Sequence, residues 1–118
     1  MDESQALLAF GALAGEPRLR IVRRLVRAGP KGMAAGDIAA AMSVSPSNMS
    51  FHLKELERAG MVASRREARS IIYAADYRAL RGLIEFLMKD CCAGRLEVLQ
   101  PAAGERPSPA ASRKRAEA

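Results

Sequence analysis

The sequence predicts a small, mainly α-helical domain that carries one β-hairpin. The composition is 49% hydrophobic but only 4% aromatic, with no tryptophan, which is typical of a core of packed aliphatic helices. Apolar residues recur with helical spacing up to Gly60, and two short strand-like segments follow. At 118 residues the chain is long enough for one domain with a modest core.

The charge balance is basic, with a formal net charge of +6 and a pI of about 10.0. This balance fits a polyanionic partner without proving one. No apolar run approaches the roughly 20 residues of a membrane span. The start, Met1-Asp2-Glu3, lacks the basic region of a signal peptide. We therefore expect a cytoplasmic protein without a membrane partner.

Three helices are expected before residue 43. Residues 3–14 predict a helix whose polar face is thin, so it is either a core helix or a dimer-interface helix; its large apolar residues are Leu7, Leu8, Phe10 and Leu13. Pro17 begins a second helix, and residues 29–32 end it. Its expected buried stripe is Leu19, Ile21, Val22, Leu25 and Val26. Its expected outer face is Arg18, Arg20, Arg23, Arg24 and Arg27. A short third helix covers residues 35–42.

The fourth helix organises the chain. Ser45 is a good N-cap, Pro46 a good first helical residue, and Gly60 a good left-handed C-terminal residue. The expected buried stripe is Met49, Leu53 and Leu56, with Phe51 partly turned in. Because a short turn joins this helix to the third, the pair has the pattern of a helix-turn-helix.

The outer face of the fourth helix has an unusual composition for a solvated helix. It carries short donors and acceptors and one cation near its N-terminus: Ser47, Asn48, Ser50, His52 and Lys54. Such side chains suit base edges and phosphates, so we predict a recognition helix for the DNA major groove. His52 is the single histidine of the chain, and without a second ligand nearby a DNA contact is favoured over a metal site.

A cationic hairpin follows the recognition helix. Residues 61–66 and 70–74 are strand-like and flank the turn 67–69, and the arginines are Arg65, Arg66 and Arg69. A hairpin of this kind directly after a recognition helix predicts the wing of a winged helix. Asp76 is expected to cap a last helix, from Tyr77 to about residue 92, that finds a partner helix.

These motifs together resemble the ArsR/SmtB family of bacterial metal-responsive repressors over roughly residues 5–92. Residues 13–21 (LAGEPRLRI) are similar to the family's L-A-D-P-T-R-L-R-I, and residues 45–56 (SPSNMSFHLKEL) to S-Q-S-T-V-S-H-H-L-K-x-L. Further matches are Asp37-Ile38-Ala39, Ala59-Gly60-Met61-Val62 and residues 65–73 (RREARSIIY). The resemblance implies the order α-α-α-α-β-β-α.

The resemblance also implies a homodimer, paired through its first and last helices, that represses transcription from a pseudo-palindromic double-stranded DNA operator. Recognition helices in successive major grooves would lie roughly 34 Å apart. The implied DNA contacts are Ser45, Ser47, Asn48, Ser50, His52 and Lys54, and the wing contacts are Arg65, Arg66 and Arg69. Residues 1–94 would form the DNA-binding and dimerisation domain, and residues 95–118 a flexible, disordered basic tail.

One of three sensor sites of the resembled family is present in part. The Cys-x-Cys pair is replaced at residues 34–36, and residues 77–92 lack the histidines of a zinc site. Cys91 and Cys92 match the first two cysteines of an arsenic site, while Leu99 stands near the place of the third. Trivalent arsenic prefers soft thiolates, so the pair predicts an inducer site for arsenic(III) or an organoarsenical and no required cofactor. An oxidant-sensing thiol pair and a repressor without a sensor are the alternatives.

An enzyme is not expected from this sequence. It has no glycine-rich phosphate loop, no paired carboxylates near a histidine and no Cys-x-x-Cys motif. A winged helix that binds protein instead of DNA is the remaining alternative class.

Overall fold

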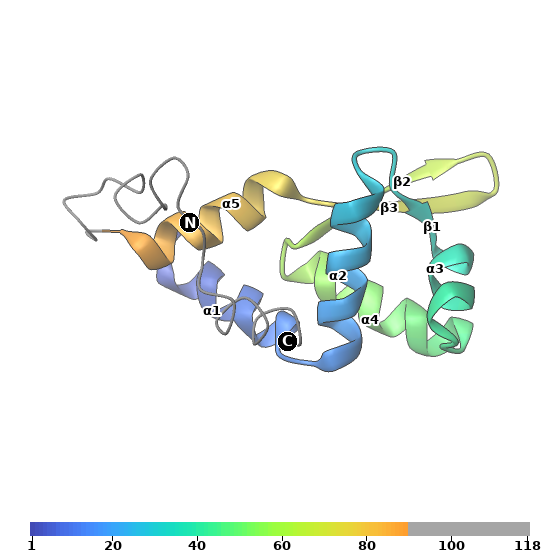
Figure 1. Ribbon diagram of the computed structural model, residues 1–118, viewed down its shortest axis with the longest axis horizontal. Coiled ribbons are helices and arrows are strands. Elements are labelled where there is room, and N and C mark those ends of the chain that lie inside the picture. Colours follow the sequence, from blue (N-terminus) through green and yellow to red (C-terminus); the bar gives the residue numbers. More distant parts are fainter. Residues whose placement is uncertain (90–118) are drawn as a thin grey trace, which may run out of the picture. The chain divides into compact units, whose positions relative to one another are not determined.

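The computed structural model describes residues 1–89, which form five helices and a small sheet (Figure 1). The elements in chain order are α1 (Glu3–Leu13), α2 (Glu16–Ala28), β1 (Met33–Ala34), α3 (Ala35–Met42), α4 (Pro46–Arg58), β2 (Val62–Glu67), β3 (Ser70–Ala75) and α5 (Tyr77–Met88). The predicted order of helices and hairpin is confirmed, with β1 added to it. The predicted last helix is described only to Met88, and residues 90–92 lie outside the described part.

The sheet is antiparallel and has the order β1-β3-β2. The predicted hairpin closes with the pair Glu67–Ser70, so its turn is Ala68-Arg69, shorter than the expected residues 67–69. The two-residue strand β1, which was not expected, pairs Met33 with Tyr73. Gly32, just before β1, has a φ of +70°, and a Cβ there would collide with the carbonyl of Tyr73. Glycine therefore lets this loop approach β3 closely.

The core is aliphatic and is shared by α2, α3, α4 and the base of the hairpin. The largest fully buried side chains are Ile21, Leu25, Ile38, Met49, Leu53, Leu56 and Met61. The expected stripe of α4 is therefore confirmed. The stripe expected for α2 was too wide, because Leu19 and Val26 are exposed. Both lie on the flank of α2, and Ile21, Val22 and Leu25 already fill its narrow contact with the core.

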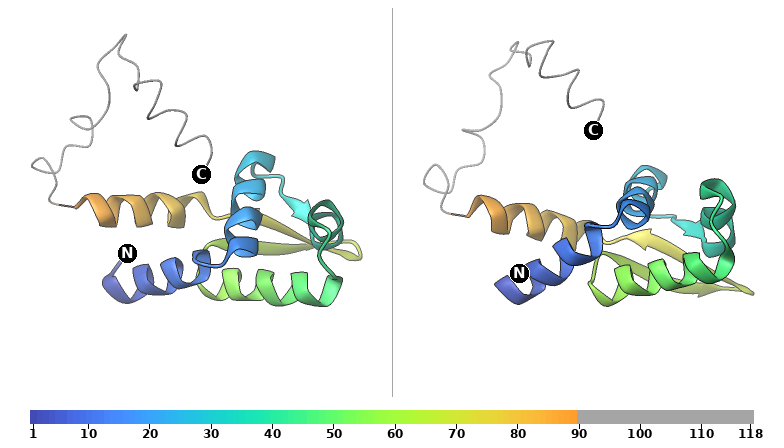
Figure 2. Two further views of the ribbon diagram at one scale, coloured as in Figure 1. Left: turned by 60° about the horizontal axis from the view of Figure 1, so that its bottom comes forward. Right: turned by 90° about the horizontal axis from the view of Figure 1, so that it is seen from below.

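Helix α1 buries its small residues and exposes its large ones. Ala6 and Ala9 are buried, whereas the exposed fractions of Leu7 and Leu8 are 66% and 51%. On α5, Leu83 is buried, but Ile84 and Leu87 are 59% and 60% exposed. Figures 1 and 2 show both helices at the end of the fold away from the hairpin. This distribution favours the dimer-interface interpretation of α1, because a core helix would bury its leucines.

Several predicted helix ends are confirmed. The backbone N–H of Asn48 donates to the Ser45 side chain (3.2 Å), and the N–H of Ala79 donates to the Asp76 carboxylate (3.0 Å). Gly60 has a φ of +81°, and the N–H of Met61 donates to the carbonyl of Leu56 (2.9 Å). A left-handed glycine with this bond is a frequent end of a helix. The position and direction of α4 are therefore determined at both ends.

Replacing Ala68 by glycine is expected to stabilise the protein. Ala68 has a φ of +53° in the hairpin turn, where an L side chain crowds the backbone. Removing the Ala68 methyl group should raise the free energy of unfolding by about 0.5–1 kcal/mol. This is the net gain, because glycine also has more conformational freedom to lose from the unfolded chain. Urea denaturation followed by circular dichroism measures this change. An unchanged or lower midpoint would contradict it.

Candidate nucleic-acid interface

The turn between α3 and α4 has the geometry that the helix-turn-helix pattern predicts. Ser43 has a left-handed backbone (φ +56°), and the N–H of Val44 donates to the carbonyl of Ala39 (3.0 Å). Ser45 then caps α4. Ile38 and Ala39 of α3 are buried with Met49 and Leu53 of α4, so packing maintains the angle between the two helices.

The outward face of α4 is polar and lacks carboxylates over its first two turns. Ser47, Asn48, Ser50 and Lys54 are all exposed, and no acidic residue lies between Pro46 and Lys54. The unpaired N–H groups and dipole of the helix N-terminus add positive potential at this end. Ser47, Ser50 and Lys54 lie within about 60° of one another around the helix, whereas Asn48 lies on its other flank.

Phe51 lies on this outward face, and the expectation that it turns partly inward is wrong. Its side chain is 59% exposed, and its ring meets the ring of His52 edge to face with centroids 5.7 Å apart. At 100° per residue, position 51 points away from Met49, Leu53 and Leu56 and lies between Ser47 and Lys54. Its apolar character had suggested partial burial, but its position on the helix excludes it.

His52 lies on the flank of α4 beside α2, partly shielded from solvent. Its Nδ1 atom is 3.4 Å from Nη1 of Arg18, whose Nε donates to the carbonyl of Ala12 (2.7 Å). Arg18 is half-buried, so its expected place on the outer face of α2 is wrong. It connects the end of α1 with α4. His52 therefore lies on the α2 flank of α4, on the side away from Ser50 and Lys54.

The hairpin arginines differ in their surroundings. Arg65 donates through Nε to Glu67 (2.7 Å) and through Nη2 to the carbonyl of Lys31 (2.8 Å), so it holds the hairpin against the loop before β1. Ser64 donates to Glu57 of α4 (2.7 Å). Since side chains two apart share a face of a strand, Arg66 lies on the α4 side of the hairpin.

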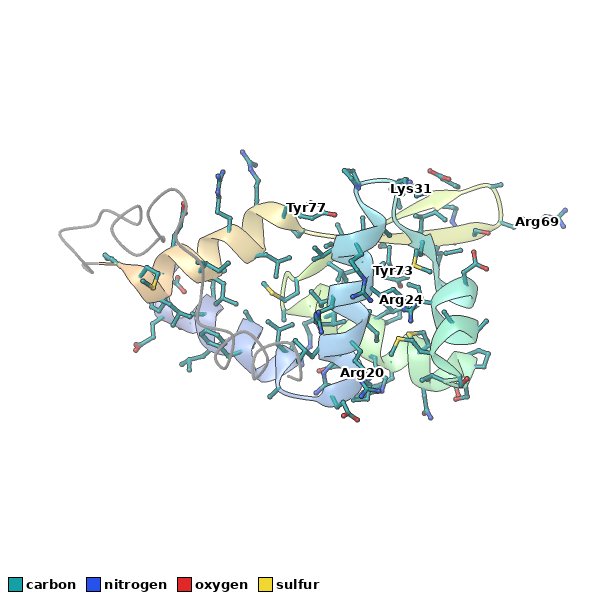
Figure 3. The ribbon with its side chains drawn as sticks, viewed as in Figure 1. Arg20, Arg24, Lys31, Arg69, Tyr73 and Tyr77 are labelled. Carbon is teal, nitrogen blue, oxygen red and sulfur yellow. The ribbon has the colours of Figure 1, made fainter. Side chains whose placement is uncertain are left out.

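Arg69 lies at the tip of the hairpin and points away from the fold (Figure 3). Within residues 1–89, neither Arg66 nor Arg69 takes part in an ion pair. Both are exposed. Two free guanidinium groups thus extend the basic surface from α4 along the hairpin.

The acidic residues of α4, Glu55 and Glu57, are confined to its C-terminal half, where each accepts a hydrogen bond. Glu55 accepts a hydrogen bond from Arg58 (2.6 Å), which lowers the pKa of Glu55 and raises the pKa of Arg58. Glu57 is bonded to Ser64. Because Glu55 keeps its charge paired, it offsets little of the positive potential at the N-terminal half of the helix.

The proposed sensor cysteines, Cys91 and Cys92, and the tail 95–118 lie outside the described residues. Among residues 1–89, no group of three or more histidine, cysteine or acidic side chains is placed to hold a metal ion. Over the same residues, no helix has the length and apolar character needed to cross a membrane.

This chain is similar in sequence to known helix-turn-helix transcriptional regulators. Residues 13–65 match the family described as a helix-turn-helix domain. The chain is 34% identical over 69 residues to YceK of Bacillus subtilis, an uncharacterized HTH-type transcriptional regulator, and the match covers 58% of this chain and 68% of YceK. It is 29% identical over 91 residues to the transcriptional activator HlyU of Vibrio cholerae, covering 77% and 82% of the two chains.

Solved structures agree with these matches. HlyU from Vibrio cholerae N16961 superposes with a TM-score of 0.61 at 29% identity, covering 78% of this chain and 99% of HlyU. The homodimeric winged helix-turn-helix DNA-binding domain Mb0332 from Mycobacterium bovis, a possible ArsR-family regulator, has a TM-score of 0.61 at 26% identity, with coverages of 72% and 77%. From its fold, its helix-turn-helix and these relatives, the chain belongs to the ArsR family of winged helix-turn-helix transcriptional regulators.

Proposed function

We propose that this regulator is a dimeric transcriptional repressor that binds a pseudo-palindromic operator through α4 and the β2–β3 hairpin. The observation that carries the proposal is the continuous exposed surface of α4 and hairpin, with Ser47, Ser50 and Lys54 on the helix and Arg66 and Arg69 beyond it. Side chains of the first kind suit base edges and the arginines suit phosphates. We assign the repressor to the cytoplasm and give it no catalytic role.

Dimer formation is supported by the exposed apolar side chains of α1 and α5. Leu7, Leu8, Ile84 and Leu87 are each more than half exposed, which is costly for a monomer in water. Mb0332, which has the same fold, is homodimeric. A twofold dimer presents two copies of α4, so its operator should contain two related half-sites about 10–10.5 base pairs apart, or a multiple of that spacing.

Selection from a random duplex library tests this proposal directly. The purified chain should enrich inverted repeats, and fluorescence anisotropy with the selected duplex should give log-linear weakening with salt. Enrichment of no common sequence, or binding that ignores salt, would contradict a DNA-binding role. Salt-independent capture of a protein would instead support the alternative of a protein-binding winged helix.

We further propose that trivalent arsenicals release the operator by binding Cys91 and Cys92. The support is the sequence Asp90-Cys91-Cys92-Ala93-Gly94, because two adjacent thiols suit an arsenic atom with one position already blocked by carbon. The pair follows α5, the proposed dimer helix. Closing a ring of As–S bonds there would change how the two protomers are paired and so misalign the two α4 helices.

Replacing both Cys91 and Cys92 by serine should leave operator binding unchanged and abolish release by phenylarsine oxide. The physical reason is that hydroxyl groups do not replace thiolates as arsenic ligands. Anisotropy of the operator complex is titrated with phenylarsine oxide, arsenite, zinc and peroxide. Release of the double variant by an arsenical would overturn the assignment. If peroxide alone releases the operator from the wild type, a redox sensor is favoured. If none of the four compounds releases the operator, a repressor without a sensor is favoured.

A further inference from the structure

A second cationic site lies on α2, on a surface that the proposed operator contact does not use. Four arginines and the end of α3 line a groove of about 390 Å³: Arg20, Arg23, Arg24, Arg27, Ala41 and Met42. The volume falls in the range of small-ligand sites. Figure 3 shows Arg20 and Arg24 along α2.

The charge of this groove is largely uncompensated. Arg20 forms an exposed ion pair with Glu16 (3.3 Å), and within residues 1–89 no other ion pair involves the four arginines. They follow the spacing i, i+3, i+4 and i+7, so neighbouring like charges repel along one helix face. An anion with several negative groups would relieve this repulsion, and guanidinium forks match phosphate oxygens in pairs.

The groove and the α4 face are directed away from each other. Ile21, Val22 and Leu25 of α2 and Met49, Leu53 and Leu56 of α4 enter one common core. At 100° per residue, Arg20, Arg23 and Arg27 lie opposite the buried stripe of α2, as Lys54 lies opposite that of α4. The right view of Figure 2 shows α2 and α4 on opposite sides of the fold. A duplex on α4 therefore does not cover this groove.

We infer that the α2 groove is a binding site for a small anion that bears linked phosphate groups. Guanidinium groups of Arg23 and Arg27 would bind the phosphate oxygens, while Ala41 and Met42 provide an apolar wall. The site is separate from the proposed operator surface on α4 and the hairpin.

Calorimetric titration of the full chain with inorganic tripolyphosphate at physiological salt tests the site. We expect saturable binding of one tripolyphosphate per protomer and weaker binding of citrate, a polycarboxylate without phosphate. The variant Arg23→Gln/Arg27→Gln should bind tripolyphosphate at least about tenfold more weakly, since two charge-assisted contacts are removed. The same variant should keep its operator affinity.

The matched control is Arg66→Gln/Arg69→Gln, which removes the same charge from the hairpin and should retain tripolyphosphate binding. Equal losses in the two variants would show that net charge alone attracts the anion and would overturn the site. Binding that survives Arg23→Gln/Arg27→Gln would place the anion elsewhere in the chain. Displacement of bound tripolyphosphate by a duplex without operator sequence would mean that the groove binds nucleic acid, which also overturns the inference.

A different observation supports a second inference, which rests on the proposed function. Phe51 is a large apolar ring, 59% exposed, in the middle of the outward face of α4. The 5-methyl group of thymine is the apolar feature of the major groove, and aromatic side chains contact it. We propose that Phe51 selects thymine at one position of each operator half-site.

Replacing that thymine by deoxyuridine removes only the methyl group. The wild type should then lose about fourfold in affinity per half-site, which is the effect of one buried methyl group. Phe51→Ala should bind the two duplexes equally and still prefer the operator over unrelated DNA. If the wild type binds both duplexes equally while retaining operator specificity, the role of Phe51 is wrong but the DNA-binding role stands.

Discussion

Replacing Leu8, Ile84 and Leu87 together by glutamine is expected to convert the regulator to a monomer and to weaken operator binding by about 100-fold or more. All three side chains are more than half exposed on α1 and α5, so their loss leaves the core intact. Glutamine keeps the helix propensity and adds no charge. Light scattering after size exclusion measures the mass, and fluorescence anisotropy measures the affinity.

The size of this effect follows from the geometry of two half-sites. A dimer binds its second half-site as an intramolecular step, whereas a monomer must bind each half-site independently. The control is Arg81→Gln/Glu85→Gln, which changes two exposed residues of the same α5 and removes one exposed ion pair without changing the net charge. The control should stay dimeric and bind normally. A dimeric triple variant would show that the protomers pair through another surface.

The positions of the major elements could be predicted because each had its own local signal. Capping residues and glycine marked the ends of α4, and the change to strand-like residues after Gly60 marked the hairpin. Strand β1 could not be predicted in this way. A two-residue strand has no periodicity, and it exists only because Gly32 lets the loop approach Tyr73 from a distant part of the chain.

Errors in the candidate site came from treating apolar residues as buried and charged residues as exposed. Phe51 is apolar but points outward, whereas Arg18 is charged but is half-buried between α1 and α4. For Phe51, the helical angle from Met49 and Leu53 was a usable signal. For Arg18 the same signal was available, because it stands three, four and seven residues before the buried Ile21, Val22 and Leu25. Its partners Ala12 and His52 come together only in the fold. The α2 groove likewise needs α3 as its second wall.

Removing the two free hairpin arginines, as Arg66→Gln/Arg69→Gln, should weaken operator binding roughly 100-fold at physiological salt and reduce the slope of log K against log salt by about 3–4. A dimer carries four of these guanidinium groups, and each phosphate contact that is lost leaves its condensed counterion in place. Arg65 is excluded from the variant because it holds the hairpin through Glu67 and Lys31. Anisotropy titrations at several salt concentrations measure the slope.

The variant Arg23→Gln/Arg27→Gln is the control for where DNA binds, because it removes the same charge from the opposite side of the fold. If the hairpin contacts phosphate, the α2 variant should keep nearly the full slope, since counterions are released only where a cation lies against the backbone. Equal slopes for the two variants would refute a wing contact. The expected result is a reduced slope in the hairpin variant alone, while that variant still prefers the selected inverted repeat. This result would separate two roles: the wing arginines supply affinity, and α4 reads the sequence.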